Sequence, residues 1–117
     1  MAERLLDVAV AVIGLLPALG DKSGGKNLMS QLERCGPGGG ANYEEARGAE
    51  SPADFVHKVR IALKEVRETR YWLRLILRAK LVDRPHELKP LVDECGELVA
   101  ILTASARTAR RRAATRK

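Results

Sequence analysis

Residues 51–77 read SPADFVHKVRIALKEVRETRYWLRLIL, and they form the clearest helical pattern in the chain. Ser51 is a good N-cap, Pro52 suits the first helical position, and Asp54 adds an acid to the first turn. Apolar residues then recur every three or four positions, which puts them on one helix face. This face comprises Phe55, Val59, Ala62, Val66, Leu73, Ile76 and Leu77. The stretch predicts a long amphipathic helix that needs other helices to cover its apolar face.

Three other segments carry the same helical periodicity. The first runs from about residue 2 to 19, the second from about 22 to 48, and the last begins near Pro85 or Pro90. No segment has the pattern of a strand, and aromatic residues are scarce, at 3% of the chain. Four helices with short links predict an all-α fold, an up-and-down antiparallel four-helix bundle over residues 1–106. A basic C-terminal tail follows over residues 107–117.

The first helix is apolar on two sides. Leu6, Val10 and Ile13 add apolar surface opposite its main stripe. The core of so small a domain covers only one side of a helix, so we expect these three residues at an oligomer interface. The alternative is that this helix is simply the most buried one of a monomer. Trp72 is assigned to the same interface, although packing in the core is favoured over a partner contact.

The run Gly36-Pro37-Gly38-Gly39-Gly40 interrupts the second helical segment. Glycine costs up to about 1 kcal/mol and proline about 3 kcal/mol in a helix interior, so local propensity predicts a break or a kink. A phosphate-binding loop is a poor explanation, because no strand precedes the glycines and no Lys-Ser/Thr pair follows them. Close approach of a neighbouring helix backbone explains the glycines better.

Positive charge is concentrated at the C-terminus. The formal net charge is +6, and six of the 21 basic residues lie in the last eleven positions, which leaves 15 basic against 15 acidic residues elsewhere. The six are Arg107, Arg110, Arg111, Arg112, Arg116 and Lys117. A basic arm on a neutral body predicts salt-sensitive, sequence-independent binding of nucleic acid. The alternatives are a frayed end that aids solubility and cations that stabilise a helix C-terminus.

Catalysis and metal binding find little support in the sequence. Two Asp-x-x-His pairs, at residues 54–57 and 83–86, have the spacing used by metal sites in helical bundles. However, His57 faces away from the apolar stripe, and Pro85 interrupts the second pair. No arrangement of nucleophile and base is visible. We expect a protein that is not an enzyme and that has no metal, no cofactor and no small-molecule substrate.

Cys35 and Cys95 lie sixty residues apart in apolar helical patterns, which is typical of buried thiols in a reducing compartment. The apolar run at residues 8–19 is too short to span a bilayer, and no clean cleavage site follows it. These features predict a cytoplasmic location without membrane contact.

Five short motifs, in this order along the chain, resemble one protein family. They are Gln31-Leu32-x-Arg34, Gly40-Ala41-Asn42-Tyr43-x-Glu45-Ala46, Ser51-x-x-Asp54-Phe55-x-x-Lys58, Lys64-Glu65-x-x-Glu68-Thr69-x-Tyr71-Trp72-Leu73 and Glu97-Leu98-x-x-Ile101-Leu102. The ordered set resembles the bacterial four-helix-bundle proteins encoded within intervening sequences of 23S ribosomal RNA genes. The resemblance covers almost the whole chain except the tail.

The resemblance implies an antiparallel bundle that assembles as a ring-like homopentamer and has no catalytic residues. A related branch serves as the accessory protein of diversity-generating retroelements and contacts a reverse transcriptase and nucleic acid. Two hypotheses follow: a scaffold that binds RNA or DNA through its basic tail, or a protein-interaction module such as a reverse-transcriptase partner. The chain departs from the family at Pro37-Gly38-Gly39. We nevertheless expect a continuous or mildly kinked second helix, because tertiary packing overrides local propensity.

Overall fold

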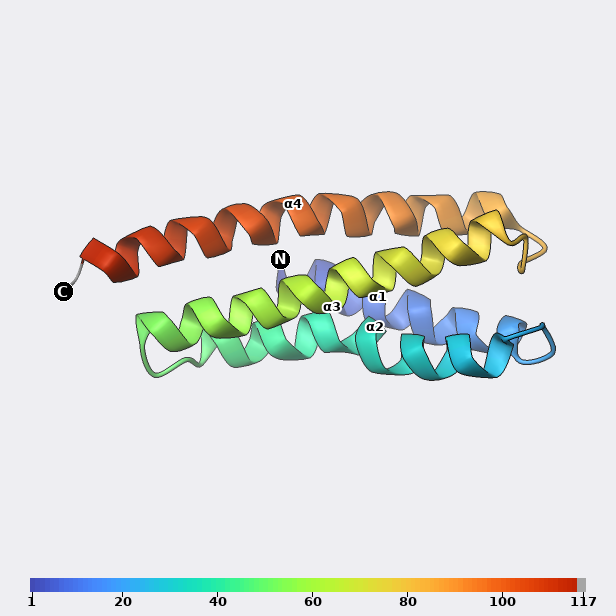
Figure 1. Ribbon diagram of the computed structural model, residues 1–117, viewed down its shortest axis with the longest axis horizontal. Coiled ribbons are helices and arrows are strands. Elements are labelled where there is room, and N and C mark those ends of the chain that lie inside the picture. Colours follow the sequence, from blue (N-terminus) through green and yellow to red (C-terminus); the bar gives the residue numbers. More distant parts are fainter. Residues whose placement is uncertain (116–117) are drawn as a thin grey trace.

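The computed structural model describes residues 1–115, and all the regular secondary structure within them is helical. They are α1 (Ala2–Leu15), the 3-10 helix η1 (Leu16–Leu19), α2 (Gly25–Arg47), α3 (Pro52–Arg78) and α4 (Pro85–Thr115). Figure 1 shows them running alternately up and down along a rod of 54 × 21 × 20 Å. The predicted all-α four-helix bundle is confirmed.

Local sequence signals explain where the helices begin and end. The Ser51 hydroxyl accepts a hydrogen bond from the Asp54 backbone N–H at 3.1 Å, as an N-cap does. The first helix is shorter than the sequence predicted, because Pro17 cannot continue an α-helix and the chain tightens into η1. Of the two prolines proposed to start the last helix, Pro85 does so, and Pro90 lies within it.

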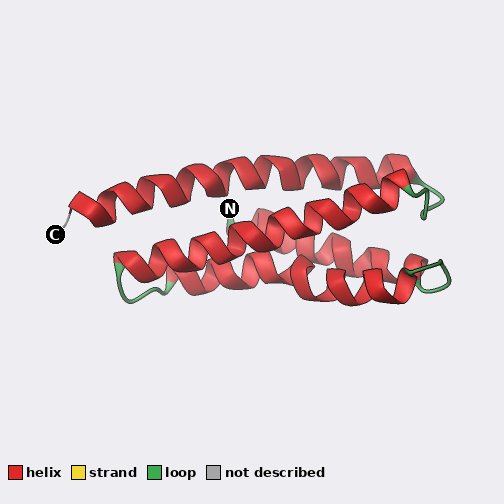
Figure 2. Ribbon diagram, in the orientation of Figure 1, coloured by secondary structure: helices red, strands yellow, loops and turns green. Residues whose placement is uncertain are grey.

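The glycine run does not break α2. Figure 2 draws this helix without interruption from Gly25 to Arg47. A Cβ atom added at Gly36 would lie 2.6 Å from Val12 Cγ1 of α1, and one at Gly39 would lie 2.7 Å from Val66 Cγ2 of α3. These glycines let α1 and α3 approach the α2 backbone, and the packing gained offsets their poor helix propensity.

One apolar core runs along the bundle. Side chains that solvent does not reach include Leu19, Leu32, Leu73, Leu98 and Leu102. Cys35 and Cys95 are also buried, and both are free thiols. Burial raises the pKa of both thiols, that of Cys95 to about 12, so neither is an activated nucleophile.

The helices differ in length, and this shapes the end of the molecule. With 14 residues, α1 spans about 21 Å, whereas the 31 residues of α4 span about 46 Å. The N-terminus of α1 lies near mid-length in Figure 1, and α4 continues past it. An ion pair joins α1 to α4 along the line where the two helices meet, which we call the α1–α4 seam. Arg4 Nε donates to Glu94 Oε2 at 2.9 Å, and Arg4 Nη2 donates to Glu94 Oε1 at 2.6 Å. The end of α4 thus extends past α1, but it still lies beside the start of α3, where Thr108, Ala109 and Arg112 line a groove with Pro52 and Phe55.

Candidate nucleic-acid interface

The predicted basic tail is the final part of α4 as far as Thr115. Ala106 is the last core residue of this helix, and Ala109 and Ala113, further along, are half-buried. Exposed arginines cover the other sides of the same turns; they are Arg107, Arg110, Arg111 and Arg112. Arg116 and Lys117 lie outside the described residues. Four of the six predicted binding residues are thus presented together on one helix.

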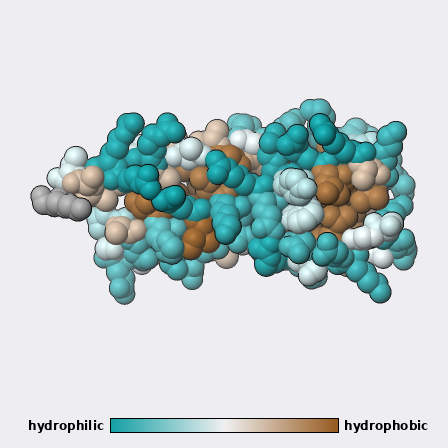
Figure 3. Space-filling model, in the orientation of Figure 1, coloured by the Kyte–Doolittle hydropathy of each residue, from teal (hydrophilic) through white to brown (hydrophobic). Residues whose placement is uncertain are grey.

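Nothing in the described part of the chain neutralises these arginines. No carboxylate between residues 1 and 115 forms an ion pair with any of the four. Hydrophilic side chains project over this end of α4, at the upper left of Figure 3. The arginines also complement the partial negative charge of a helix C-terminus, which is the competing structural explanation for them.

The predicted oligomer residues on α1 are exposed in the single chain. The exposed fractions are 54% for Leu6, 65% for Val10 and 48% for Ile13. The three follow each other at a spacing of four and then three residues, so they form one apolar strip on the outside of α1. Trp72 is different, because it is half-buried against the core and its indole N–H donates to Glu68 Oε2 at 3.2 Å.

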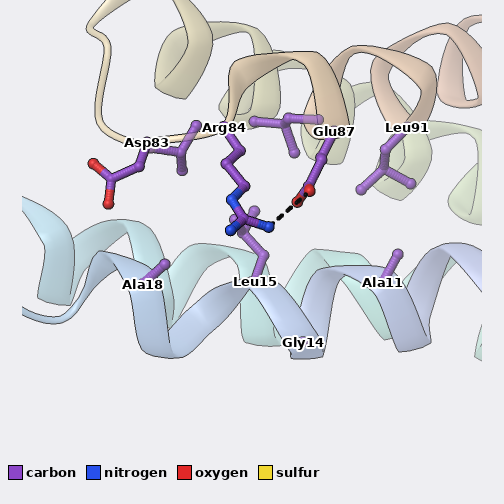
Figure 4. A pocket seen from close by; sticks show the side chains of 10 residues that line it. Ala11, Gly14, Leu15, Ala18, Asp83, Arg84, Glu87 and Leu91 are labelled. Carbon is purple, nitrogen blue, oxygen red and sulfur yellow. Dashed lines mark hydrogen bonds and ion pairs between the residues drawn. The ribbon is translucent and has the colours of Figure 1, made fainter.

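A groove lies between α1 and the start of α4, next to the seam that Arg4 closes. Figure 4 shows small residues, Ala11, Gly14 and Ala18, along one wall and Arg84 with Glu87 on the other. Arg84 Nη1 and Glu87 Oε1 are 3.3 Å apart, and the groove measures about 430 Å³. Arg84 and Glu87 pair with each other, and Asp83, which also lines the groove, has no nucleophile or base beside it.

No group of three or more His, Cys, Asp or Glu side chains gathers at metal-binding distance within residues 1–115. His57 and His86 are both exposed. Over the same residues, none of the helices combines the length and the apolar character that crossing a bilayer requires.

Sequence reasoning missed a second basic surface on α3. Five cations share its outward face, and Tyr71 lies among them; we name this set the α3 ridge. The cations are Arg60, Lys64, Arg67, Arg74 and Arg78. The signal was present in the sequence, because the intervals of the ridge alternate between four and three residues. The ridge was hidden because the charges of residues 1–106 sum to zero. In the fold, the cations of the ridge lie on one side of α3, whereas Glu65 and Glu68 lie on the side that faces α2.

These features define a class: a small all-α bundle with an exposed apolar strip and unpaired basic surfaces. Comparison with known proteins identifies the family. Residues 4–104 match the 23S rRNA-intervening sequence protein family, and the chain belongs to it. The match ends before Arg107, so the basic end of α4 lies beyond the shared part.

A solved structure agrees with this assignment. It is that of a protein with unknown function from the S23 ribosomal protein family of Bacteroides thetaiotaomicron. It is similar to this chain with a TM-score of 0.78 and 31% sequence identity, over 90% of this chain and 96% of the other. None of the curated proteins matches the chain.

Proposed function

We propose that this protein is a non-enzymatic, oligomeric helical scaffold of the cytoplasm that binds nucleic acid, RNA foremost, through the basic end of α4. The carrying observation is that Arg107, Arg110, Arg111 and Arg112 are exposed, lack carboxylate partners within residues 1–115 and lie together on the last turns of α4. Cations held in this way bind phosphates and release counterions.

The proposed oligomer forms through the apolar strip of Leu6, Val10 and Ile13. Three large apolar side chains about half exposed on one helix face are unusual for a surface that stays in water. The family resemblance implies a ring-like homopentamer. Such a ring would present several basic α4 ends at once, and linked sites bind a long polyanion far more tightly than one site does.

The alternative function is a protein-interaction module, for example an accessory partner of a reverse transcriptase, in which the basic end only aids solubility. The observation that favours it is the same apolar strip, since an exposed strip fits a different protein as well as a second copy of this chain. It predicts a stable complex with one protein and little binding of RNA alone.

The test compares three proteins in binding structured RNA and duplex DNA at low salt. The tail variant changes Arg107, Arg110, Arg111 and Arg112 to Gln, which keeps helix propensity. The control variant removes the same charge from Lys22, Lys26, Arg47 and Arg84, which are exposed elsewhere. We expect the tail variant to bind RNA at least about tenfold more weakly than the control variant.

Two results would contradict the proposal. If the unmodified protein binds neither RNA nor DNA at low salt, it is not a nucleic-acid scaffold. If the tail and control variants bind equally, the basic end of α4 is not the contact, and only charge in general matters.

A further inference from the structure

The α3 ridge extends along most of its helix. From Arg60 to Arg78 it covers 19 residues, and the 18 steps between its ends rise about 27 Å in an α-helix. Every member is exposed. The ridge therefore offers a row of cations long enough to follow several successive phosphates of a nucleic-acid chain.

The fold keeps negative charge away from the ridge. Glu65 and Glu68, the acidic residues nearest to it in sequence, lie on the side of α3 that faces α2, where both pair with Arg34. No carboxylate within residues 1–115 forms an ion pair with any of the five ridge cations. The ridge keeps its full charge for a partner.

Tyr71 interrupts the row of cations with an aromatic ring. Tyr71 is 57% exposed, and its ring meets that of Trp72 edge-on, with centroids 5.1 Å apart and planes at 76°. Trp72 is itself fixed by its hydrogen bond to Glu68. Arg67 and Arg74 flank Tyr71 by one helical turn on either side. The Tyr71 ring is thus held on one side by Trp72 and has a cation on either side of it along the helix.

A groove between α3 and α4 borders the Tyr71 side chain. It measures about 410 Å³, and its lining includes Arg67, Arg70, Arg74 and Tyr71 and no carboxylate among the described residues. Arg70 lies over Gly96 of α4, where an added Cβ would be 3.2 Å from Arg70 Nε. This Nε is buried and finds no acceptor within residues 1–115. Arginine is the side chain that pairs best with phosphate, and a phosphate in the groove would meet the guanidinium groups of Arg67, Arg70 and Arg74.

From this juxtaposition we infer that the α3 ridge is a second binding surface, one for single-stranded nucleic acid, with a base stacked on Tyr71 and the flanking phosphates on Arg67, Arg70 and Arg74. It rests on the proposed function in that both surfaces bind nucleic acid. Stacking needs an unpaired base, because a duplex keeps its bases inside. An anionic membrane fits less well, since the ridge lacks the large apolar residues that insert into lipid.

The ridge and the basic end of α4 lie on the same side of the molecule. At about 100° per residue, Arg107 lies within roughly 20° of Gly96 around α4 and about 16 Å further along it. Arg70 of α3 covers Gly96. A nucleic-acid strand that leaves the α3–α4 groove along α4 therefore reaches the arginines at the C-terminal end of that helix.

The experiment measures binding of a fluorescent, unstructured single-stranded RNA and of a duplex of equal length to the full chain. The ridge variant changes Arg60, Arg67, Arg74 and Arg78 to Gln, and the control variant described above removes equal charge elsewhere. A second pair, Tyr71→Ala and Tyr71→Phe, separates stacking from charge. We expect Tyr71→Ala to weaken single-strand binding roughly tenfold and Tyr71→Phe to bind single strands as the unmodified protein does. Duplex binding should change little in both variants.

We also expect the ridge variant to lose about 0.7 from its single-strand salt slope for each phosphate contact removed, whereas the control variant keeps the slope. Equal binding by the ridge and control variants overturns the inference, as does a Tyr71→Ala protein that binds single strands normally. If in that case the tail variant still loses binding, the proposed function survives alone. If only the ridge and Tyr71 variants lose binding, the ridge is the binding surface and the basic end of α4 is not.

Discussion

At the scale of single residues, the glycines of α2 decide how closely the helices pack. Gly39 has no room for a Cβ beside Val66, whereas a Cβ at Gly40 would have its nearest neighbour, Leu5 Cβ, at 3.5 Å, an ordinary contact. We expect Gly39→Ala to lower the free energy of unfolding by about 1–3 kcal/mol, as overpacking does. Gly40→Ala should raise it by about 0.5–1 kcal/mol, because alanine is the better helix former.

Urea denaturation of both variants beside the unmodified protein measures these changes. Two alanine variants of equal stability would mean that α3 does not press on the α2 backbone at Gly39.

The sequence showed that the glycine run at residues 36–40 opposes a helix and that glycines permit close approach of a neighbouring helix. It did not show which glycines touch a neighbour, because that depends on the rotation of three helices about their axes.

At the scale of helices, the ion pair between α1 and α4 gives the seam a pH dependence. The hydrogen bonds from Arg4 lower the pKa of Glu94 below its ordinary value near 4.5. A carboxyl group with a lowered folded pKa stabilises the fold above its unfolded pKa, and this contribution disappears as the pH falls through the folded pKa. We expect Glu94→Gln to lower Tm slightly at pH 7.

The Tm difference between Glu94→Gln and the unmodified protein should shrink as the pH falls below about 4.5. Thermal unfolding at pH 7, 5 and 3 follows it, with Glu97→Gln as the matched control, because Glu97 lies further from Arg4, at 3.5 Å, and is more exposed. A difference that stays constant over this range would show that the pair acts through packing and not through charge.

Helix positions were largely predictable, because capping residues and apolar periodicity are local signals. Ser51 and Pro52 marked the start of α3 correctly. The end of α1 was placed four residues too late, since the apolar periodicity continues through Pro17 and concealed its effect. The partnership of Arg4 with Glu94 could not be predicted, because the two are 90 residues apart and neither belongs to a motif.

At the scale of the whole molecule, the exposed strip on α1 predicts self-association. We expect the double variant Val10→Asp with Ile13→Asp to form a smaller species in solution than the unmodified protein, because charges at the centre of an apolar interface are costly. Its helical circular dichroism should be retained. Ile101→Asp, at a residue 39% exposed on α4, is the matched control and should leave the mass unchanged. A monomeric unmodified protein would contradict the oligomeric part of the proposal.

The candidate site was only half predictable at this scale. The arginines of the α4 end stand together in the sequence, so their concentration was visible without a structure. The ridge on α3 was not recognised, because its cations alternate with acids that Arg34 of another helix pairs with. The spacing of the cations was visible in the sequence, but only the fold shows that Glu65 and Glu68 turn away from them towards α2.

Nucleic-acid binding at the basic end of α4 is tested by the affinity of the unmodified protein and of the tail variant for single-stranded RNA at 50 and 200 mM salt. Four phosphate contacts at the basic end of α4 contribute about 50-fold to the affinity that the unmodified protein loses over this range, so the tail variant should lose about 50-fold less than the unmodified protein. Affinities that respond equally to salt in both proteins would contradict a nucleic-acid contact at the basic end of α4.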